Sequence, residues 1–591
     1  MDLTNVLAAL DSGTAGHKLE TQTLDFKTEK ADFRSTAQDL AEACVCFANA
    51  EGGTVLLGVA DRPTGESSFV GTTMESDLLR RKIFDLTRPS LTVDVEELHH
   101  AGARLLRIDV PAGIDVYSTT RGQYFQRWTD QCQPMEPHSV ARLTAECRGE
   151  DWSAVSSGLS IDAVDPVALA KAAELLAHSQ DAPRERLAKE EPARLLAGLE
   201  LLCPDGTLTR AGALLFVADR NFGPRELVAY QHRRTPSGEA DAKRRWTGPL
   251  ILVFDELMEA VTAPIDSTPL TLSNGRQILL EDYPLSAVRE ALANAITHRD
   301  YASPRPVTII HSPQHFEVRS PGPLVTGITI ENLLSRGTRP RYPLLARAFN
   351  RFGWVEYLGQ GFNRMFREMA RIGKPLPQIR TTIDEVEVSL EGSAPNIHVA
   401  RLVADLPAEV QVDTDSLLIL MRLCEKKSVT ASEIAVLVQR EKEYSEKALR
   451  RLSDPAVDLI EPTTGTRARR FPNYRLRGSA LARLGSAVAY HTRSVAESDR
   501  QVIEHVRDFE SINNSALQRM FDIDVYTARD ILKDLTARGI LVRTSEQSRG
   551  VAVRYGPGPA FPNARRPSRS RLSRPSDGER PNDGHEDDVL F

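Results

Sequence analysis

The feature that most constrains the fold is a helical pattern at residues 285–297, in which two polar side chains stand among alanines and leucines. Glu290 and Asn294 are four residues apart, so both leave the same face of one helical turn. A carboxylate there can polarise a water molecule, and an amide oxygen can hold Mg²⁺ between phosphate groups. Downstream, Ser320-Pro321-Gly322 ends a predicted strand and Gly359-Gln360-Gly361 opens a predicted helix. Backbone N–H groups in such glycine turns bind phosphate oxygens, so this order of elements predicts nucleotide binding.

The length of the chain requires several domains. Its 591 residues exceed what one hydrophobic core organises, so we expect three to five domains. Lys and Arg total 74 against 81 Asp and Glu, which gives a net charge of -7. This balance excludes a histone-like or ribosomal type of binder with an overall basic surface. Any nucleic-acid surface must therefore be a local patch.

The cysteines and the apolar segments indicate the compartment. None of the six cysteines has the paired spacing of a structural zinc site, so we expect reduced thiols and a cytoplasmic location. The N-terminal sequence MDLTNVLAAL lacks the cationic start of a signal peptide, and no apolar stretch reaches 18 residues. We therefore expect no membrane span. A GxxxxGK[ST] motif is also absent, which disfavours a P-loop helicase or motor.

The order of helical, strand and turn patterns predicts a multidomain α+β protein. The helix pattern at 37–49 leads through Glu51-Gly52-Gly53 into a strand at 54–59, and the apolar run 213–217 is predicted as a further strand. Two later units each read as three short helices followed by a two-stranded ribbon, which is typical of winged helices. The predicted segments are an α+β domain (1–150), a bridging α/β module (151–240), a second α/β domain (241–400), two winged-helix units (410–480 and 495–556) and a disordered tail rich in Arg, Pro and Ser (557–591).

The second α/β domain resembles a known ATPase group. The stretch from Arg289 to Tyr301, with Pro321-Gly322, Pro340-Arg341 and Leu358-Gly359-Gln360-Gly361, is similar to the divergent GHKL (Bergerat-type) ATPase domain of bacterial proteins often labelled RecG-like. The resemblance implies an ATP-binding α/β sandwich with Glu290 as the water-activating base and Asn294 as the Mg²⁺ ligand. Ser320, Gly322, Gly359 and Gly361 complete the implied ATP site.

One position departs from that family pattern. Where GHKL proteins have an aspartate that recognises the adenine amino group, this chain has Ser320. The plainer interpretation is that Glu290, Asn294 and His298 form a polar helix face and that the glycines are ordinary caps and turns.

A second group of candidate residues lies near the N-terminus. Glu20 and Asp25 are five residues apart beside Lys27, and Asp61 follows the glycine-turn strand. Three carboxylates at strand and loop ends predict a site for Mg²⁺ or Mn²⁺ that hydrolyses phosphodiesters. The plainer interpretation is an exposed strand edge with an ion pair of little energetic value, next to a structural turn at Glu51-Gly52-Gly53.

This N-terminal stretch is similar to the Schlafen Alba-type (AlbA_2) domain, through Phe47–Gly53 and Gly58-Val59-Ala60-Asp61. For many bacterial members the resemblance implies DNA binding. In animal Schlafens two glutamates and an aspartate at these places form an RNase centre, so Glu20, Asp25 and Asp61 are the implied catalytic and metal-binding residues. Asp25 is shorter than the usual glutamate by one methylene.

The second winged-helix unit contains the predicted DNA contacts. Its recognition helix would begin at Val525 and the wing would span 544–550. The candidate contacts are Tyr526, Thr527, Arg529, Lys533 and Arg549. In the first unit Lys442, Tyr444, Ser445 and Lys447 hold the equivalent places, but Glu441, Glu443 and Glu446 lie among them. Winged helices also serve as protein-docking modules, and that alternative is stronger for the first unit.

These patterns lead to one main hypothesis and two rivals. The main hypothesis is a cytoplasmic bacterial regulator of transcription that binds DNA and responds to ATP. The first rival is a metal-dependent nuclease that acts on RNA or single-stranded DNA, and the second is a scaffold in which neither centre is active. GHKL relatives often dimerise, so a homo-oligomer is also an expectation of the resemblance.

Overall fold

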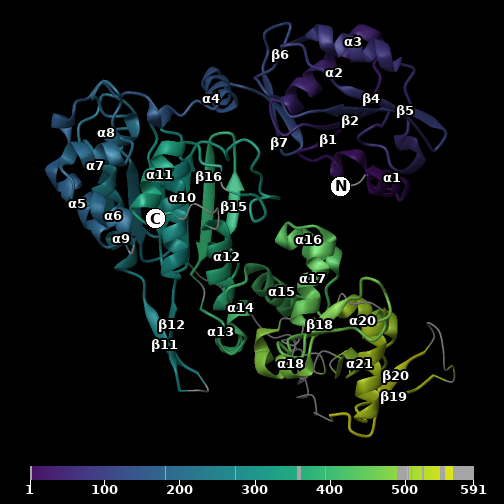
Figure 1. The fold of residues 1–591 in the computed structure, drawn as a ribbon. Coiled ribbons are helices and arrows are strands. Elements are labelled where there is room, and N and C mark those ends of the chain that lie inside the picture. Colours follow the sequence, from purple (N-terminus) through teal and green to yellow (C-terminus); the bar gives the residue numbers. More distant parts are fainter. Residues whose placement is uncertain are drawn as a thin grey trace, which may run out of the picture. The chain divides into compact units, whose positions relative to one another are not determined.

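The chain forms two compact units, residues 1–490 and 491–591, in a computed structural model (Figure 1). The structure describes residues 3–562 apart from 180, 273–274, 338, 356–360, 393, 489–498, 500–501, 504, 508, 522–524, 546 and 548–552. Most of the tail predicted at 557–591 therefore lies outside the described residues. None of the described helices combines the length and the apolar character that crossing a bilayer requires.

A four-stranded sheet forms the centre of the N-terminal α+β region. The strand order is β1-β2-β5-β4, with β1 parallel to β2 and the other pairs antiparallel. Helices α2 and α3 pack on one face of the sheet and α1 on the other. The elements are α1 (Leu3–Asp11), β1 (Leu24–Lys27), α2 (Phe33–Ala48), β2 (Gly53–Leu57), α3 (Ser76–Leu86), β4 (Asp94–His100) and β5 (Ala103–Val110). The predicted α+β class is confirmed.

The glycine turn between α2 and β2 is required by close packing. Gly52 has a φ of 77°, which favours glycine. A Cβ at Gly53 would lie 2.6 Å from Cδ1 of Phe47 and 2.7 Å from the carbonyl oxygen of Thr23. Glu51-Gly52-Gly53 is thus a structural turn, and it aligns β2 parallel to β1.

Two short hairpin-like pairs follow the sheet, and one of them contains a disulfide. These strands are β3 (Thr87–Arg88) with β6 (Ser118–Thr119), and β7 (Phe125–Trp128) with β8 (Gln131–Pro134). Cys132 of β8 is bonded to Cys46 of α2 across 86 residues. The expectation of six reduced cysteines was therefore wrong for this pair, because only the folded chain brings the two thiols together.

The bridging segment is helical. Its helices are α4 (Pro137–Arg148), α5 (Pro166–Ala177), α6 (Ala182–Leu187), α7 (Pro192–Gly198) and α8 (Arg210–Phe216). The strand predicted at 213–217 was wrong, because Thr209 caps α8 by accepting a hydrogen bond from the Gly212 N–H at 3.1 Å. The run is apolar on all sides because α8 is buried in the largest core of the chain.

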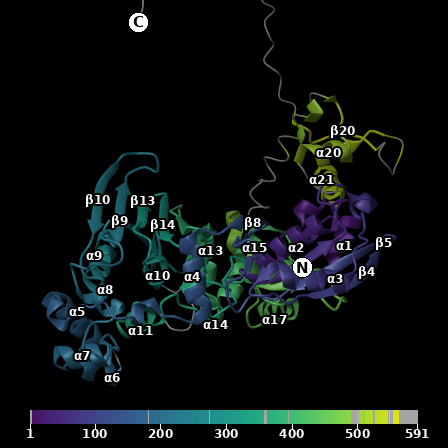
Figure 2. The same cartoon turned by 90° about the horizontal axis from the view of Figure 1, so that it is seen from above.

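A six-stranded sheet organises the following α/β region. Its order is β10-β9-β13-β14-β16-β15, and helices α9, α10 and α12 share one core with it. Figure 2 shows β10, β9, β13 and β14 side by side, with α9 and α10 next to them. The elements are β9 (Val228–Arg233), β10 (Ala240–Trp246), α9 (Leu250–Thr262), β11 (Ser267–Thr271), β12 (Gln277–Glu281), α10 (Leu285–His298), β13 (Val307–His311), β14 (His315–Pro321), α11 (Pro343–Arg351), α12 (Gly361–Arg371), β15 (Gln378–Thr381) and β16 (Glu385–Glu391). The boundary predicted at residue 240 needs correction, since it separates β9 from β10, which pair in this sheet.

A third core closes the first unit. It contains the elements α13 (Ile397–Ala404), α14 (Ala408–Gln411), α15 (Thr414–Glu425), α16 (Ala431–Val438), α17 (Lys442–Leu452), β17 (Ile460–Pro462), β18 (Tyr474–Leu476) and α18 (Gly478–Leu484). Helices α15 to α17 and the pair β17–β18 occupy the predicted first winged-helix unit. This core also includes Leu334 and Ala370 from the α/β region, so the two regions are packed together.

The second unit is small and has its own core. The described elements are α20 (Asn514–Phe521), α21 (Val525–Ala537), β19 (Leu541–Arg543) and β20 (Tyr555–Pro557), and the described residues between 499 and 509 are helical. Ala528, Leu532 and Leu535 of α21 are buried in this core. Their spacing leaves the other side of α21 exposed.

Candidate nucleotide site and nucleic-acid surfaces

A pocket of about 100 Å³ lies between α10, the six-stranded sheet and the loop that follows β14. Helix α10 contributes Asn294 and His298, strand β14 contributes Ser320, and α12 begins at the pocket with Gly361. Residues from the stretch 322–339 form the remaining wall, and the described residues of 322–341, which exclude 338, are named the pocket loop. Candidate residues from three separate elements thus surround one cavity.

Asn294 is the polar group that most clearly lacks a partner in this cavity. Its Nδ2 atom is buried, and within the described part of the chain no hydrogen-bond partner reaches it. Leaving a buried amide unsatisfied costs about 1–3 kcal/mol. A Cβ at Gly361 would lie only 2.9 Å from this atom, so the start of α12 approaches Asn294 as closely as a glycine permits. Nδ2 is a donor, so an anionic group such as a phosphate oxygen would satisfy it together with the N–H groups at the helix N-terminus, whereas a cation would be held by Oδ1 of the same side chain.

Glu290 lies one helical turn before Asn294 and is 5% exposed. Its Oε1 accepts a hydrogen bond from Nη1 of Arg364 on α12 at 2.9 Å. A Cβ at Gly361 would lie 2.8 Å from its other oxygen. The carboxylate is therefore held against α12, and activating a water molecule would require Arg364 to release it.

Ser320 is buried in the wall of the pocket. Its Oγ donates a hydrogen bond to the carbonyl oxygen of Ala295 at 2.9 Å. The lone pairs of the hydroxyl oxygen remain available as acceptors, which is what an exocyclic amino group of adenine needs. Ser320 can thus accept one hydrogen bond where an aspartate would accept with a charged oxygen, and such a neutral bond is weaker.

The two predicted glycine turns differ in which backbone N–H groups remain available to bind phosphate. Gly322 has a φ of 95°, and its N–H donates to the carbonyl oxygen of Asp384 at 2.7 Å. The prediction that this N–H is free for phosphate was therefore wrong, because strand β16 and its preceding turn already use it. Gly361 opens α12, whose first N–H groups have no partner within the helix. Gly359 lies outside the described residues.

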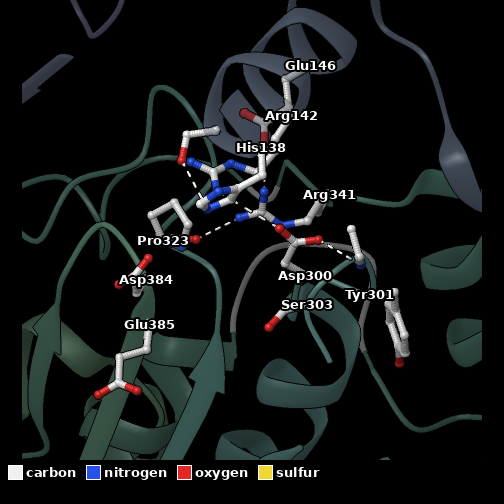
Figure 3. Close-up of polar contacts among 12 residues, drawn as sticks. His138, Arg142, Glu146, Asp300, Tyr301, Ser303, Pro323, Arg341, Asp384 and Glu385 are labelled. Carbon is white, nitrogen blue, oxygen red and sulfur yellow. Dashed lines mark hydrogen bonds and ion pairs between the residues drawn. The ribbon is translucent and has the colours of Figure 1, made fainter. Parts of the chain in front are cut away.

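Arg341 connects the pocket to helix α4 (Figure 3). Its side chain is 2% exposed and donates to the carbonyl oxygens of His298 at 3.0 Å and Pro323 at 2.6 Å. It also forms an ion pair with Glu146 of α4 at 2.5 Å, and Glu146 accepts a further hydrogen bond from Thr326 at 2.5 Å. The sequence motif contained Arg341 but gave no signal for Glu146, which is 195 residues away.

His298 is neutral under physiological conditions in this arrangement. Burial, and then the charge of Arg341, lowers the pKa of its imidazole to about 4. A neutral ring at the pocket wall leaves the charge of this region to the arginines of the pocket loop, Arg336 and Arg339.

These residues fit a nucleotide with Mg²⁺, with one condition. Asn294 would hold the metal ion, the start of α12 would contact phosphate, and Ser320 would accept from the base. When bound, Mg²⁺ supplies neutralisation of the phosphate charge. The condition concerns size, because ligand pockets typically enclose roughly 300–1,000 Å³. The pocket loop must therefore move outward to admit a nucleotide.

The three N-terminal carboxylates lie near one another. Burial, and then the charges of Asp25 and Asp61, raises the pKa of Glu20 to about 7. Burial and the Asp25 charge also raise the pKa of Asp61. Asp25 is 2% exposed, with Nζ of Lys27 at 2.6 Å and Nη1 of Arg127 at 3.7 Å from its oxygens. The structure thus unites the predicted residues but neutralises the central one with two cations.

The metal site predicted for Glu20, Asp25 and Asp61 stays a prediction. Among the described residues, no group of three or more His, Cys, Asp and Glu side chains is arranged so that it could hold a metal ion. A metal ion bound there would compete with the ion pairs that Asp25 makes with Lys27 and Arg127.

Replacing Glu20 with glutamine is expected to remove a pH-dependent loss of stability. The pKa of Glu20 rises from 4.5 to about 7 in the folded protein, so its ionisation opposes folding as the pH rises through this window. Glutamine should raise the melting temperature at pH 8.5 by about 2–4 °C, roughly 1 kcal/mol after discounting for solvent screening. At pH 4.5 the variant and the wild type should have the same melting temperature. A difference that does not depend on pH, or an equal change in the exposed control Glu66→Gln, would contradict the assignment.

Helix α21 of the second unit presents the predicted DNA contacts to solvent. Tyr526 is 68% exposed, the side chain of Arg529 is 67% exposed, and the guanidinium of Arg529 lies 5.8 Å from the centre of the Tyr526 ring. Lys533 is exposed one turn later, and Thr527 is partly exposed. Arg549 lies outside the described residues. The exposed side of α21 therefore combines two cations, a hydroxyl and an aromatic ring with two exposed carboxylates, Asp530 and Asp534, and Asp530 lies 3.8 Å from Arg529.

The corresponding helix of the first unit is different. Ser445 is fully buried, and its Oγ donates to the carbonyl oxygen of Glu441 at 3.1 Å. Glu446 is 4% exposed and accepts a hydrogen bond from Tyr474 at 2.9 Å. The placement of Ser445 among DNA contacts was therefore wrong, because α17 turns this side towards its own core.

Two family models match parts of the chain. The model described as "Schlafen, AlbA_2" matches residues 20–136, and a HATPase model, HATPase_c_4, that is named for the C-terminal region of the ATP-dependent DNA helicase recG matches residues 305–390. The chain contains an AlbA_2 domain and a HATPase-like domain. The HATPase match includes Ser320 and Gly322 but begins after α10, so the roles of Glu290 and Asn294 depend on the geometry of the pocket.

A solved structure shares this architecture. The DIP2311 protein from Corynebacterium diphtheriae is 25% identical, with a TM-score of 0.50, and the match covers 82% of this chain and 98% of that one. No curated protein matches the chain. The two domain types together indicate nucleic-acid binding and ATP-related activity.

Proposed function

We propose that this protein binds DNA and that ATP, bound in the HATPase-like domain, alters this binding, as expected of a regulator of transcription. The observation that carries the proposal is the buried Nδ2 of Asn294 on α10, which has no partner among the described residues and faces the start of α12 inside a pocket that a HATPase-type match partly covers. The AlbA_2 domain and the exposed face of α21 supply two nucleic-acid surfaces in the same chain.

The charge distribution supports local rather than general DNA contact. The chain as a whole is acidic, with a net charge of -7. On α21, however, Arg529 and Lys533 project from the side opposite the buried Ala528 and Leu532. Such a helix face suits phosphate contacts by the cations and base-edge contacts by the hydroxyl and the aromatic ring.

A gel-shift titration tests the proposal with the full chain and a pool of DNA fragments. ATP with Mg²⁺ should change the retention of selected fragments in the wild-type protein. Arg529→Ala should weaken retention about tenfold and reduce the salt dependence by roughly one phosphate contact. The matched control is Arg507→Ala, which removes an exposed cation of the same unit outside α21. The proposal would be rejected if ATP did not change the retention of DNA. It would also be rejected if Arg529→Ala and Arg507→Ala weakened retention equally.

A further inference from the structure

We infer that the first helix-turn-helix element, α16 with α17, is an internal docking module that holds the pocket loop closed, and that nucleotide binding must release it. This inference rests on the proposed nucleotide binding. It assigns to this element a role other than contact with DNA.

The turn between α16 and α17 is bonded to the backbone of the pocket loop. Oε1 of Gln439 accepts from the N–H of Leu334 at 2.6 Å, and Nε2 of the same amide donates to the carbonyl oxygen of Ile330 at 2.6 Å. Arg440 donates more weakly to the carbonyl oxygens of Ser335 at 3.4 Å and Leu334 at 3.5 Å. One amide thus satisfies a donor and an acceptor that are four residues apart, which fixes the shape of this part of the loop.

The same part of the loop has one side in the pocket and the other in the winged-helix core. Leu333 and Arg336 line the pocket. Leu334, between them, is 3% exposed and belongs to the hydrophobic core formed by α15, α16 and α17. Its carbonyl oxygen also accepts from Asn363 of α12 at 3.1 Å. Moving the loop away from the pocket would therefore disturb this core.

Helix α12 makes a second connection from the pocket, to helix α15, which shares one hydrophobic core with α16 and α17. It begins at Gly361, against Glu290 and Asn294. Two residues later, the carbonyl oxygen of Asn363 accepts from Thr414 at the start of α15 at 3.2 Å. Arg367 donates to the carbonyl oxygen of Val412 at 3.4 Å. The pocket loop is thus attached to the α16–α17 turn, and α12 is attached to α15 in the same core.

The chemistry of α17 favours docking over DNA contact. Ser445 and Glu446 are buried, and Tyr444 lies under the guanidinium of Arg440, 5.4 Å from ring centre to Cζ, while its hydroxyl bonds to Asp415. The residues at the start of this helix therefore hold the turn in shape. In a DNA-binding helix-turn-helix, the start of the second helix lies against the groove.

The size of the pocket determines the direction of the coupling. A cavity of about 100 Å³ is below the range of roughly 300–1,000 Å³ that ligand pockets occupy. The docked loop thus favours the empty state, and a ligand that requires the loop to open competes with the Gln439 contacts. By linkage, weakening these contacts must strengthen nucleotide binding, and nucleotide binding must loosen the α16–α17 turn.

A calorimetric titration of the full chain with ATP and Mg²⁺ tests this inference. The variant is Gln439→Asn, because Gln439 has a φ of 56°, a conformation that asparagine tolerates, while the shorter amide no longer reaches the loop. We expect ATP to bind at least fivefold more tightly than to the wild type, the lower end of typical coupling. The matched control is Lys447→Gln, an exposed position on α17, which should leave the affinity within about twofold.

Hydrogen exchange of residues 431–445 provides the second measurement. ATP should speed exchange in this segment of the wild-type chain. Unchanged or weaker ATP binding in Gln439→Asn, or exchange that ATP does not alter, overturns the inference. A wild-type chain that binds no ATP overturns it together with the proposed function. A chain that shows the expected coupling but no effect of ATP on DNA retention supports the inference and rejects the proposed function.

Discussion

Replacing Asn294 with alanine should abolish most of the rise in melting temperature that ATP and Mg²⁺ give the wild-type chain. The buried amide is the polar group of the pocket without a partner among the described residues, and it lies at the start of α12. At a ligand concentration 100 times the Kd, binding stabilises the folded state by about 2.7 kcal/mol. Even the loss of a group that only supports a metal ligand weakens metal binding by about 10- to 100-fold, and a loss of this size would reduce the gain to roughly 0.4–1.4 kcal/mol.

The control for this measurement is Thr297→Val on the same helix. Thr297 also has a buried side-chain oxygen without a partner in the described part of the chain, but it is not among the residues that line the pocket. Its replacement should leave the ATP-dependent shift unchanged. Asn294→Ala protein that keeps the full shift would show that the amide does not contact the ligand.

Replacing Arg341 with methionine should lower the stability of the first unit by about 3–5 kcal/mol, the usual cost of removing one partner of a buried ion pair. Its side chain is 2% exposed and Glu146 is 14% exposed, so the remaining carboxylate would be left buried and unpaired. The carbonyl oxygens of His298 and Pro323 would lose a donor at the same time. Because the first unit is large, we expect the melting temperature to fall by about 3–5 °C.

Arg339→Met is the matched control for Arg341. Arg339 belongs to the same pocket loop, but its residue is exposed, so its replacement should change stability by no more than about 0.5 kcal/mol. Equal melting temperatures for the two variants would show that the link between α4 and the pocket is not a structural support.

Local signals in the sequence were sufficient for the elements that carry the candidate sites. The helix predicted at 285–297 is α10, at Leu285–His298, because its polar pair and its apolar residues repeat with the helical period. The contacts on α21 were predicted from the place of a recognition helix in the winged-helix layout, and the structure exposes Arg529 while it buries Ala528 and Leu532. The apolar run at 213–217 had no such period, since α8 is buried on every side, and its helix was missed.

The sequence by itself thus determined the α+β class, the positions of most helices and strands, and the residue types around the candidate pocket. Only the tertiary structure decided which distant groups contact one another. It placed Arg127 on Asp25, and it joined Arg341 to Glu146 and Gln439 to Leu334 across more than a hundred residues. Periodicity and capping act within a few residues, whereas these contacts form only when separate elements pack, so no local pattern contains them.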